Sequence, residues 1–197
     1  MSNQLEALKF CDEATALTNL WLSLPRRNGA ICPTKADFSP MKLRKHLKSV
    51  VLYERLKNGE ILARVAGTNI EQFLGIDITG HNILEIFPPE FTRAYHRYYL
   101  NLAEFPCAGI VERPVRGSRG AAYMVRTLQL PMLNTSGEAV HFVGIAKSYP
   151  LPKHFTDYRG AAMTASRNLD ICYVDIGAGC PDHLETTMAR GINIEIA

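Results

Sequence analysis

The sequence lacks an apolar run approaching the ~20 residues that a membrane-spanning helix requires. Its first residues also lack the basic stretch followed by an apolar one that marks a secretory signal. These absences argue against a membrane partner and against secretion, so we expect a cytoplasmic protein. Apolar residues make up 47% of the 197 positions, which is enough to bury one globular core with extensions.

Cysteine is scarce and irregularly placed. The chain has 5 cysteines, at positions 11, 32, 107, 172 and 180. An odd number with such wide spacing fits neither a disulfide framework nor a paired C-x-x-C metal site. We therefore expect reduced, mainly structural thiols and no metal site. Cys107 is a minor candidate for a redox-sensing thiol, but the structural interpretation is preferred because no nearby cluster of cations or resolving cysteine accompanies it.

Charge of one sign is also in short supply. The net charge is +3, and the basic residues are spread over several segments. Because a nucleic-acid-binding surface concentrates its basic residues, we expect no nucleic acid partner. The sequence also shows no Ser/His/Asp set, carboxylate pair or cluster of metal ligands. We therefore expect no enzyme activity.

The strongest local signals that are present lie in a short stretch before the middle of the chain. Asn58-Gly59, between two apolar runs, predicts a two-residue β-hairpin turn in which both residues have positive φ. Thr68 and Glu71 form a capping box, in which the Thr68 hydroxyl accepts a hydrogen bond from the Glu71 backbone. A helix should therefore start at Thr68, and Gly75 should end it in a left-handed cap.

Two longer helices are also expected. In a lead helix from Phe10 to Leu24, apolar residues that include Trp21 fall on one stripe, and Pro25 ends the helix. A second helix runs from Phe91 to about Ala103, with its apolar face made of Phe91, Tyr95, Tyr98, Tyr99 and Leu102. Shorter helices are predicted after Asn82 and through Leu43 and Leu47. The apolar faces of these helices must be buried.

Five strands are expected around the helices, at residues 50–56, 61–66, 107–115, 122–133 and 139–148. The order ββαααβββ lets the middle helices cover one face of an antiparallel sheet, with a small cavity between them. We therefore predict an α+β fold in which residues 49–148 form a five-stranded antiparallel sheet with helices on one face. Residues 1–48 form an N-terminal helical extension, and residues 149–197 form a C-terminal extension with short strands.

The C-terminal extension carries a misleading motif. Asp170–Ile176 followed by Gly177 and Gly179 looks like the strand and glycine loop of Rossmann-type methyltransferases, but too few residues remain for the rest of that fold. The G-x-G is therefore interpreted as coincidence. We instead predict two short strands, Asp170–Ile176 and Ile192–Ile196, which pair with each other, with a sheet edge or with another chain.

The whole pattern resembles a PAS domain, and most closely the short stand-alone bacterial PAS-like proteins. The shared motif is R-x-x-G-T-x-I-x-x-x-x-G-x-x-x-T-G after a Trp-containing lead helix, matched here by Trp21, Arg64, Gly67, Thr68, Ile70, Gly75, Thr79 and Gly80. The resemblance spans about Leu20 to Tyr149. It implies a sensory or signalling protein that binds a small ligand or a partner protein, signals through dimer contacts and has no catalytic activity.

A second interpretation keeps the PAS fold without a ligand. In that case the protein is an adaptor whose lead helix and tail dock a signalling protein. A sensor requires a cavity with convergent polar groups, whereas an adaptor requires a filled core and an exposed apolar patch. The apolar lead helix fits either a homodimer contact or a contact with the chain's own sheet.

The aromatic face of the second long helix is the candidate wall of a pocket. Together with facing strand positions, the pocket candidates are Ala63, Val65, Phe91, Tyr95, Tyr98, Tyr99, Tyr123 and Val125. Such a cavity suits a small aromatic or acyl ligand. The simpler alternative is that these tyrosines are core residues. A slip of one residue along a strand would exchange its inward and outward residues.

The ligand's identity is unknown, and haem and flavin are both disfavoured. In PAS domains that hold haem, the resemblance implies an axial histidine from the long helix. Here His96 points away from the apolar stripe of that helix, and His81 lies in a turn. Blue-light PAS domains carry an N-C-R-F-L-Q run, which is absent. The basic loop with Arg113, Arg116 and Arg119 is a candidate site for an anionic partner, with a solvated hairpin as the alternative.

Overall fold

The computed structural model describes residues 5–87, 89–116, 122–151 and 169–181. Its centre is a six-stranded antiparallel sheet in the order β2-β1-β5-β4-β3-β6. The strands are β1 (Val50–Arg55), β2 (Ile61–Ala66), β3 (Ala108–Arg116), β4 (Ala122–Leu133), β5 (Ala139–Pro150) and β6 (Asp170–Val174). The predicted α+β fold and its five core strands are confirmed, and the tail supplies a sixth.

Strand β6 pairs with the edge of β3, with Tyr173 opposite Gly109. Of the three partners left open for the first tail strand, the structure shows the sheet edge. The Asp175 carboxylate then accepts the backbone N–H groups of Gly177 and Gly179, at 2.7 and 2.9 Å. The glycine loop therefore closes around its own aspartate. The second predicted tail strand, residues 192–196, lies outside the described residues.

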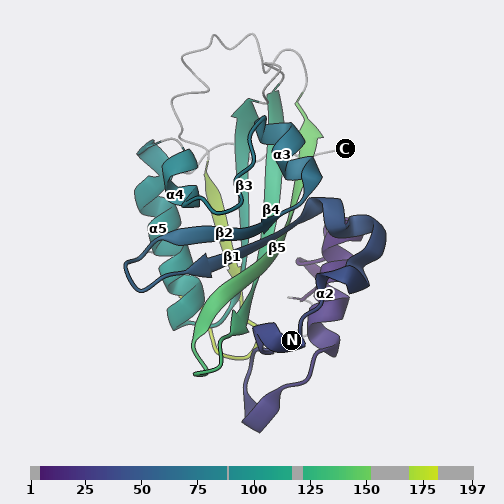
Figure 1. Ribbon diagram of the computed structural model, residues 1–197, viewed down its shortest axis with the longest axis vertical. Helices are drawn as coiled ribbons and strands as arrows, with labels where there is room; N and C mark the ends of the chain where they lie inside the picture. Colours follow the sequence, from purple (N-terminus) through teal and green to yellow (C-terminus); the bar gives the residue numbers. More distant parts are fainter. Residues whose placement is uncertain (1–4, 88, 117–121, 152–168, 182–197) are drawn as a thin grey trace.

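Helices cover both faces of the sheet (Figure 1). On one face lie α3 (Thr68–Leu74), α4 (Ile83–Ile86) and α5 (Pro89–Glu104), and on the other lies α2 (Asp12–Ser23). The predicted apolar face of α5 is buried, since none of its five residues is more than 7% exposed. Among the described helices, none is long and apolar enough to cross a membrane.

The lead helix α2 packs on the chain's own sheet. Ala14, Leu17 and Trp21 are buried in one cluster with residues of β4 and β5. The Trp21 indole N–H donates a hydrogen bond to the Pro131 carbonyl at 2.9 Å, and the Arg26 guanidinium lies 4.2 Å from the centre of its ring. These contacts answer the open question of what covers the apolar stripe of this helix, whereas homodimer formation stays a prediction.

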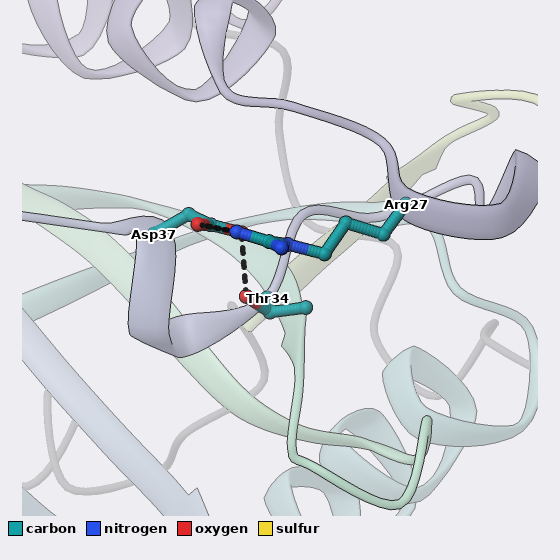
Figure 2. Close-up of polar contacts among 3 residues, drawn as sticks. All are labelled: Arg27, Thr34 and Asp37. Carbon is teal, nitrogen blue, oxygen red and sulfur yellow. Dashed lines mark hydrogen bonds and ion pairs between the residues drawn. The ribbon is translucent and has the colours of Figure 1, made fainter.

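The connection from α2 to β1 contains three 3₁₀ segments, η1 (Arg27–Gly29), η2 (Lys35–Asp37) and η3 (Pro40–Ser49). Figure 2 shows what joins the first two: the Arg27 guanidinium binds both carboxylate oxygens of Asp37, at 2.6 and 3.1 Å, and the Thr34 hydroxyl donates to the same group at 2.7 Å. The helix predicted through Leu43 is η3, and it breaks at Arg44, where φ is 46°.

The β1–β2 hairpin differs in detail from the predicted turn. Leu56 accepts the Gly59 N–H and donates its own N–H to Glu60, so three residues form the loop. Only Gly59 has positive φ, 89°. Asn58 instead uses its side chain, which accepts the Glu60 N–H at 3.1 Å. A type I turn followed by a left-handed glycine closes hairpins of this length, so the hairpin prediction is right and its turn type is wrong.

Helix α3 spans the predicted residues, but its cap is Gly67 and not Thr68. No side chain donates or accepts a capping hydrogen bond at this end. The cap position takes a glycine because a Cβ there would lie 2.4 Å from the Lys48 carbonyl oxygen. Gly75 ends the helix in the left-handed conformation as predicted, with φ at 78°. Asn82 caps α4 as predicted, accepting the Leu84 N–H at 3.2 Å.

Candidate ligand cavity

A cavity of about 890 Å³ lies between α3, α4 and α5 and the face of the sheet that they cover. Ligand pockets usually measure ~300–1,000 Å³. The wall opposite the sheet carries Tyr95, Tyr98 and Tyr99 of α5, and Tyr53 of β1 completes an aromatic cluster with them. The middle helices therefore do not fill the space above the sheet.

Five of the eight predicted pocket residues line this cavity: Tyr95, Tyr98, Tyr99, Tyr123 and Val125. Ala63 and Phe91 are buried in the hydrophobic cluster on the same side of the sheet, without belonging to the lining. Val65 is 39% exposed. The structure thus brings the three tyrosines of α5 together with the β4 candidates, and it leaves Phe91 and the β2 candidates outside the lining.

A β-bulge explains why Val65 is misplaced. Tyr53 pairs with Ala63 and Leu52 pairs with Val65, so Arg64 is an extra residue on β2. Such a residue shifts the alternation of faces. Ala63 therefore shares the helix-covered face with Tyr53, while Val65 lies opposite Leu52, whose side chain belongs to the α2 side. The expectation that Ala63 and Val65 face the same cavity is wrong.

Sequence reasoning missed a buried polar residue in the cavity, Gln129 of β4. It is 2% exposed, and its side-chain oxygen has no hydrogen-bond partner among the described residues. The neighbouring strands place Gly109 and Gly144 opposite it. The Gln129 amide lies over Gly144, and the Tyr98 ring lies over Gly109. Glycines inside predicted strands signal such close approaches, and this signal could have identified the site.

Unpaired polar groups in a buried position are costly unless a ligand or water binds them. The Tyr98 hydroxyl is also buried without a partner among the described residues. Burial raises the pKa of Tyr98 and Tyr99, and the neighbouring tyrosines raise it further. These phenols therefore stay protonated at neutral pH. A buried amide oxygen and a buried hydroxyl beside the cavity have no partner among the described residues.

Arg113, predicted as part of a basic loop, faces the same cavity from β3. Its guanidinium lies 5.0 Å from the centre of the Phe87 ring. Burial raises the pKa of Tyr95, and the positive charge of Arg113 lowers it. Arg126 on the next strand takes the other face of the sheet, where it pairs with Glu112 at 2.8 Å and covers the Phe10 ring. Arg119 and the side chain of Arg116 lie outside the described residues.

A PAS domain family model matches residues 12–147. The chain belongs to the PAS domain family. The match includes α2, so the family's sequence pattern extends beyond the sheet and the helices around the cavity. Sensory and signalling roles are the common property of this family. None of the curated proteins compared with the chain matches it.

Solved structures of similar fold are distant in sequence. The PAS domain of a protein from Colwellia psychrerythraea is 14% identical, with 52% of this chain and 86% of that chain covered at a TM-score of 0.41. The PAS domain of Bordetella pertussis BvgS is 20% identical, with 54% and 82% covered at 0.40. The Vibrio cholerae VqmA dimer without target DNA is 13% identical, with 58% and 51% covered at 0.44.

The two candidate haem-ligating histidines lie away from the PAS cavity. Both His96 and His81 are exposed, and neither belongs to the lining. Cys107 is fully buried outside the cavity, and burial raises its pKa to about 12. Among the described residues, no three histidine, cysteine or acidic side chains are arranged to hold a metal ion.

Proposed function

We propose that this PAS protein is a sensor that binds a small molecule in the cavity beneath α3, α4 and α5. The observation that carries the proposal is the pairing of open volume with an unpaired buried amide: Gln129 faces about 890 Å³ of space with no partner for its side-chain oxygen among the described residues. An amide can both donate and accept. A ligand with a polar edge would satisfy it.

The aromatic walls set the other half of the proposed ligand. The Tyr98 and Tyr99 ring centroids lie 5.0 Å apart in an edge-to-face arrangement, and Phe87 stacks on Tyr95 at 4.0 Å. Aromatic surfaces of this kind favour flat or acyl ligands. The proposed protein is a cytoplasmic sensor without catalytic activity. Ligand binding changes its contact with a signalling protein, and no nucleic acid takes part.

The alternative is a ligand-free adaptor. It would require a contiguous apolar patch on the surface and no ligand cavity. Among the described residues, the large exposed apolar side chains come from different segments: Leu22, Ile31, Met41, Val65, Ile76 and Phe105. Exposed residues on separate segments do not establish such a patch, so the cavity supports a sensor more than these residues support an adaptor.

The experiment is to purify the protein from its native host and identify released small molecules by absorbance and mass spectrometry. The matched variant is Ala146→Phe, because Ala146 lines the cavity and a phenyl ring there would fill it. We expect a bound compound in near-stoichiometric amount with the wild type and little with the variant. Clean wild-type protein, together with no thermal stabilisation by a metabolite library, would favour the adaptor.

A further inference from the structure

The sign of the charge around the cavity limits its ligand further. None of the described residues that line the cavity is acidic, whereas Arg113 and Lys147 are both in the lining. The Lys147 ammonium binds Glu13 of α2 at 2.7 Å, so its charge is already neutralised on the other side of the sheet. Arg113 takes part in none of the ion pairs found within the described residues.

The Arg113 guanidinium is held in place by neutral groups. It covers the Phe87 ring at 5.0 Å, and Phe87 in turn stacks on Tyr95 at 4.0 Å with 19° between the ring planes. Tyr95 and Phe87 both line the cavity beside it. A guanidinium has five N–H donors, and contact with an aromatic face satisfies only part of that capacity. The remaining donors form a fixed fork that matches an oxyanion.

The field of Arg113 also reaches across the cavity. Burial raises the pKa of Tyr53, Tyr95 and Tyr99, while the positive charge of Arg113 lowers it at each of the three. The guanidinium therefore lies close enough to these hydroxyls to influence any group placed between them. A partly buried cation without a counter-ion is costly, and an anionic ligand would remove that cost.

From this arrangement we infer that the ligand is a small organic anion, with an aromatic or acyl body against the α5 tyrosines and its anionic oxygens bound by Arg113. The inference rests on the proposed sensor function and deepens it. The anionic group lies at the Phe87 end, where Arg113 and Tyr95 meet. The far end of the ligand reaches Gln129, whose amide forms a hydrogen bond with a polar group of the ligand. Neutral compounds of the same shape bind more weakly, because they leave Arg113 unpaired.

Two matched dyes test this inference. The probes are 8-anilinonaphthalene-1-sulfonate, an aromatic anion, and N-phenyl-1-naphthylamine, which has the same rings without the sulfonate. Binding to the folded wild-type chain is followed by calorimetry and fluorescence, with Ala146→Phe as the cavity-blocked reference. We expect the anionic dye to bind one site in the wild type, and Arg113→Gln to weaken it about tenfold or more. The neutral dye should change less than about twofold.

Two further variants separate charge from folding. Arg113→Lys keeps the charge and should retain part of the preference for the anion, and Arg126→Gln, on the opposite face, should leave both dyes unchanged. Circular dichroism checks that each variant folds. Equal losses for both dyes in Arg113→Gln, or no loss for the anionic dye, would overturn the inference while the sensor proposal stands. A wild type without any binding sensitive to Ala146→Phe would overturn both.

Competition then identifies the anionic group. Phenylacetate and phenyl phosphate are titrated against the bound anionic dye. Displacement by either one in the wild type and not in Arg113→Gln supports an anion site and assigns the carboxylate or the phosphate class. Displacement that is equal in the two proteins counts against Arg113 as the binding group.

Discussion

Asn101 of α5 donates a hydrogen bond to the Tyr173 hydroxyl of β6, at 3.0 Å between two buried side chains. The Tyr173 ring also stacks on Tyr98, with the centroids 5.9 Å apart. Since Tyr98 lines the cavity, one tyrosine of the tail strand lies directly behind one wall of the ligand site. The tail strand is thus part of the folded core.

Removing the Tyr173 hydroxyl should destabilise the protein. Tyr173→Phe leaves the Asn101 amide buried without its acceptor, and the expected cost is about 1–3 kcal/mol in the free energy of unfolding. Urea denaturation measures it. In an Asn101→Ala background the same substitution should cost much less, since the partner is already absent. Equal costs in the two backgrounds would mean that this hydrogen bond does not contribute.

Gly67→Ala should be more damaging than Gly80→Ala. A Cβ at Gly67 would lie 2.4 Å from the Lys48 carbonyl oxygen, and the contacted backbone cannot rotate away. The expected cost is about 2 kcal/mol or more. Gly80 has open space around it but a φ of 81°, so alanine there costs only about 1–2 kcal/mol of backbone strain. Thermal and urea unfolding rank the two variants, and the reverse ranking would contradict the packing at Gly67.

Alkaline pH should destabilise the fold through its buried thiols. Burial raises the pKa of Cys32 and Cys107 to about 12, from an ordinary value of 9.0. Between these values the unfolded chain has lost the thiol proton and the folded chain keeps it, so the free energy of unfolding falls as pH rises. Urea titrations at pH 8 and 10 should show a smaller fall for Cys107→Ala than for the wild type. An identical fall would exclude this thiol as a cause.

Acidic pH should destabilise the connection from α2 to β1 that Figure 2 shows. Hydrogen bonds from Arg27 and Thr34 hold the pKa of Asp37 at about 2, below its ordinary 3.8. This depressed pKa contributes stability above pH 3.8 that is lost as pH falls toward 2. Asp37→Asn should therefore flatten the acid limb of the stability curve. Arg27→Gln should flatten it too, and the double variant should add little; full additivity would argue against the pair.

The order of elements could be predicted because its signals are local. Gly75 and Asn82 end or begin their helices as their residue types suggest. The apolar stripe of α5 has no other solution than burial. The face of a strand is different, because one inserted residue such as Arg64 reverses it. No local sequence pattern in β2 predicts that bulge.

The polar part of the candidate site depended on contacts between distant segments. Gln129 matters because Gly144, on the neighbouring strand, leaves room for its amide, as Gly109 does for the Tyr98 ring. The charge of Arg113 makes it a candidate from the sequence alone, but its place in the cavity follows from the register of β3 against β4, in which it lies opposite Val125. The cap of α3 moved to Gly67 for a similar reason, since tertiary contact with Lys48 outweighed the local capping box.

The pairing of β6 with β3 also bears on self-association. Strand edges with free backbone groups are templates on which further chains add and aggregate. At the other side of the sheet, the Ala63 backbone is already hydrogen-bonded to Gly80 and His81. Because β6 is only 5 residues long and β3 has 9, the tail replaces a long open edge with a short one. Among the described strands, β6 thereby shortens the edge on which another chain could add.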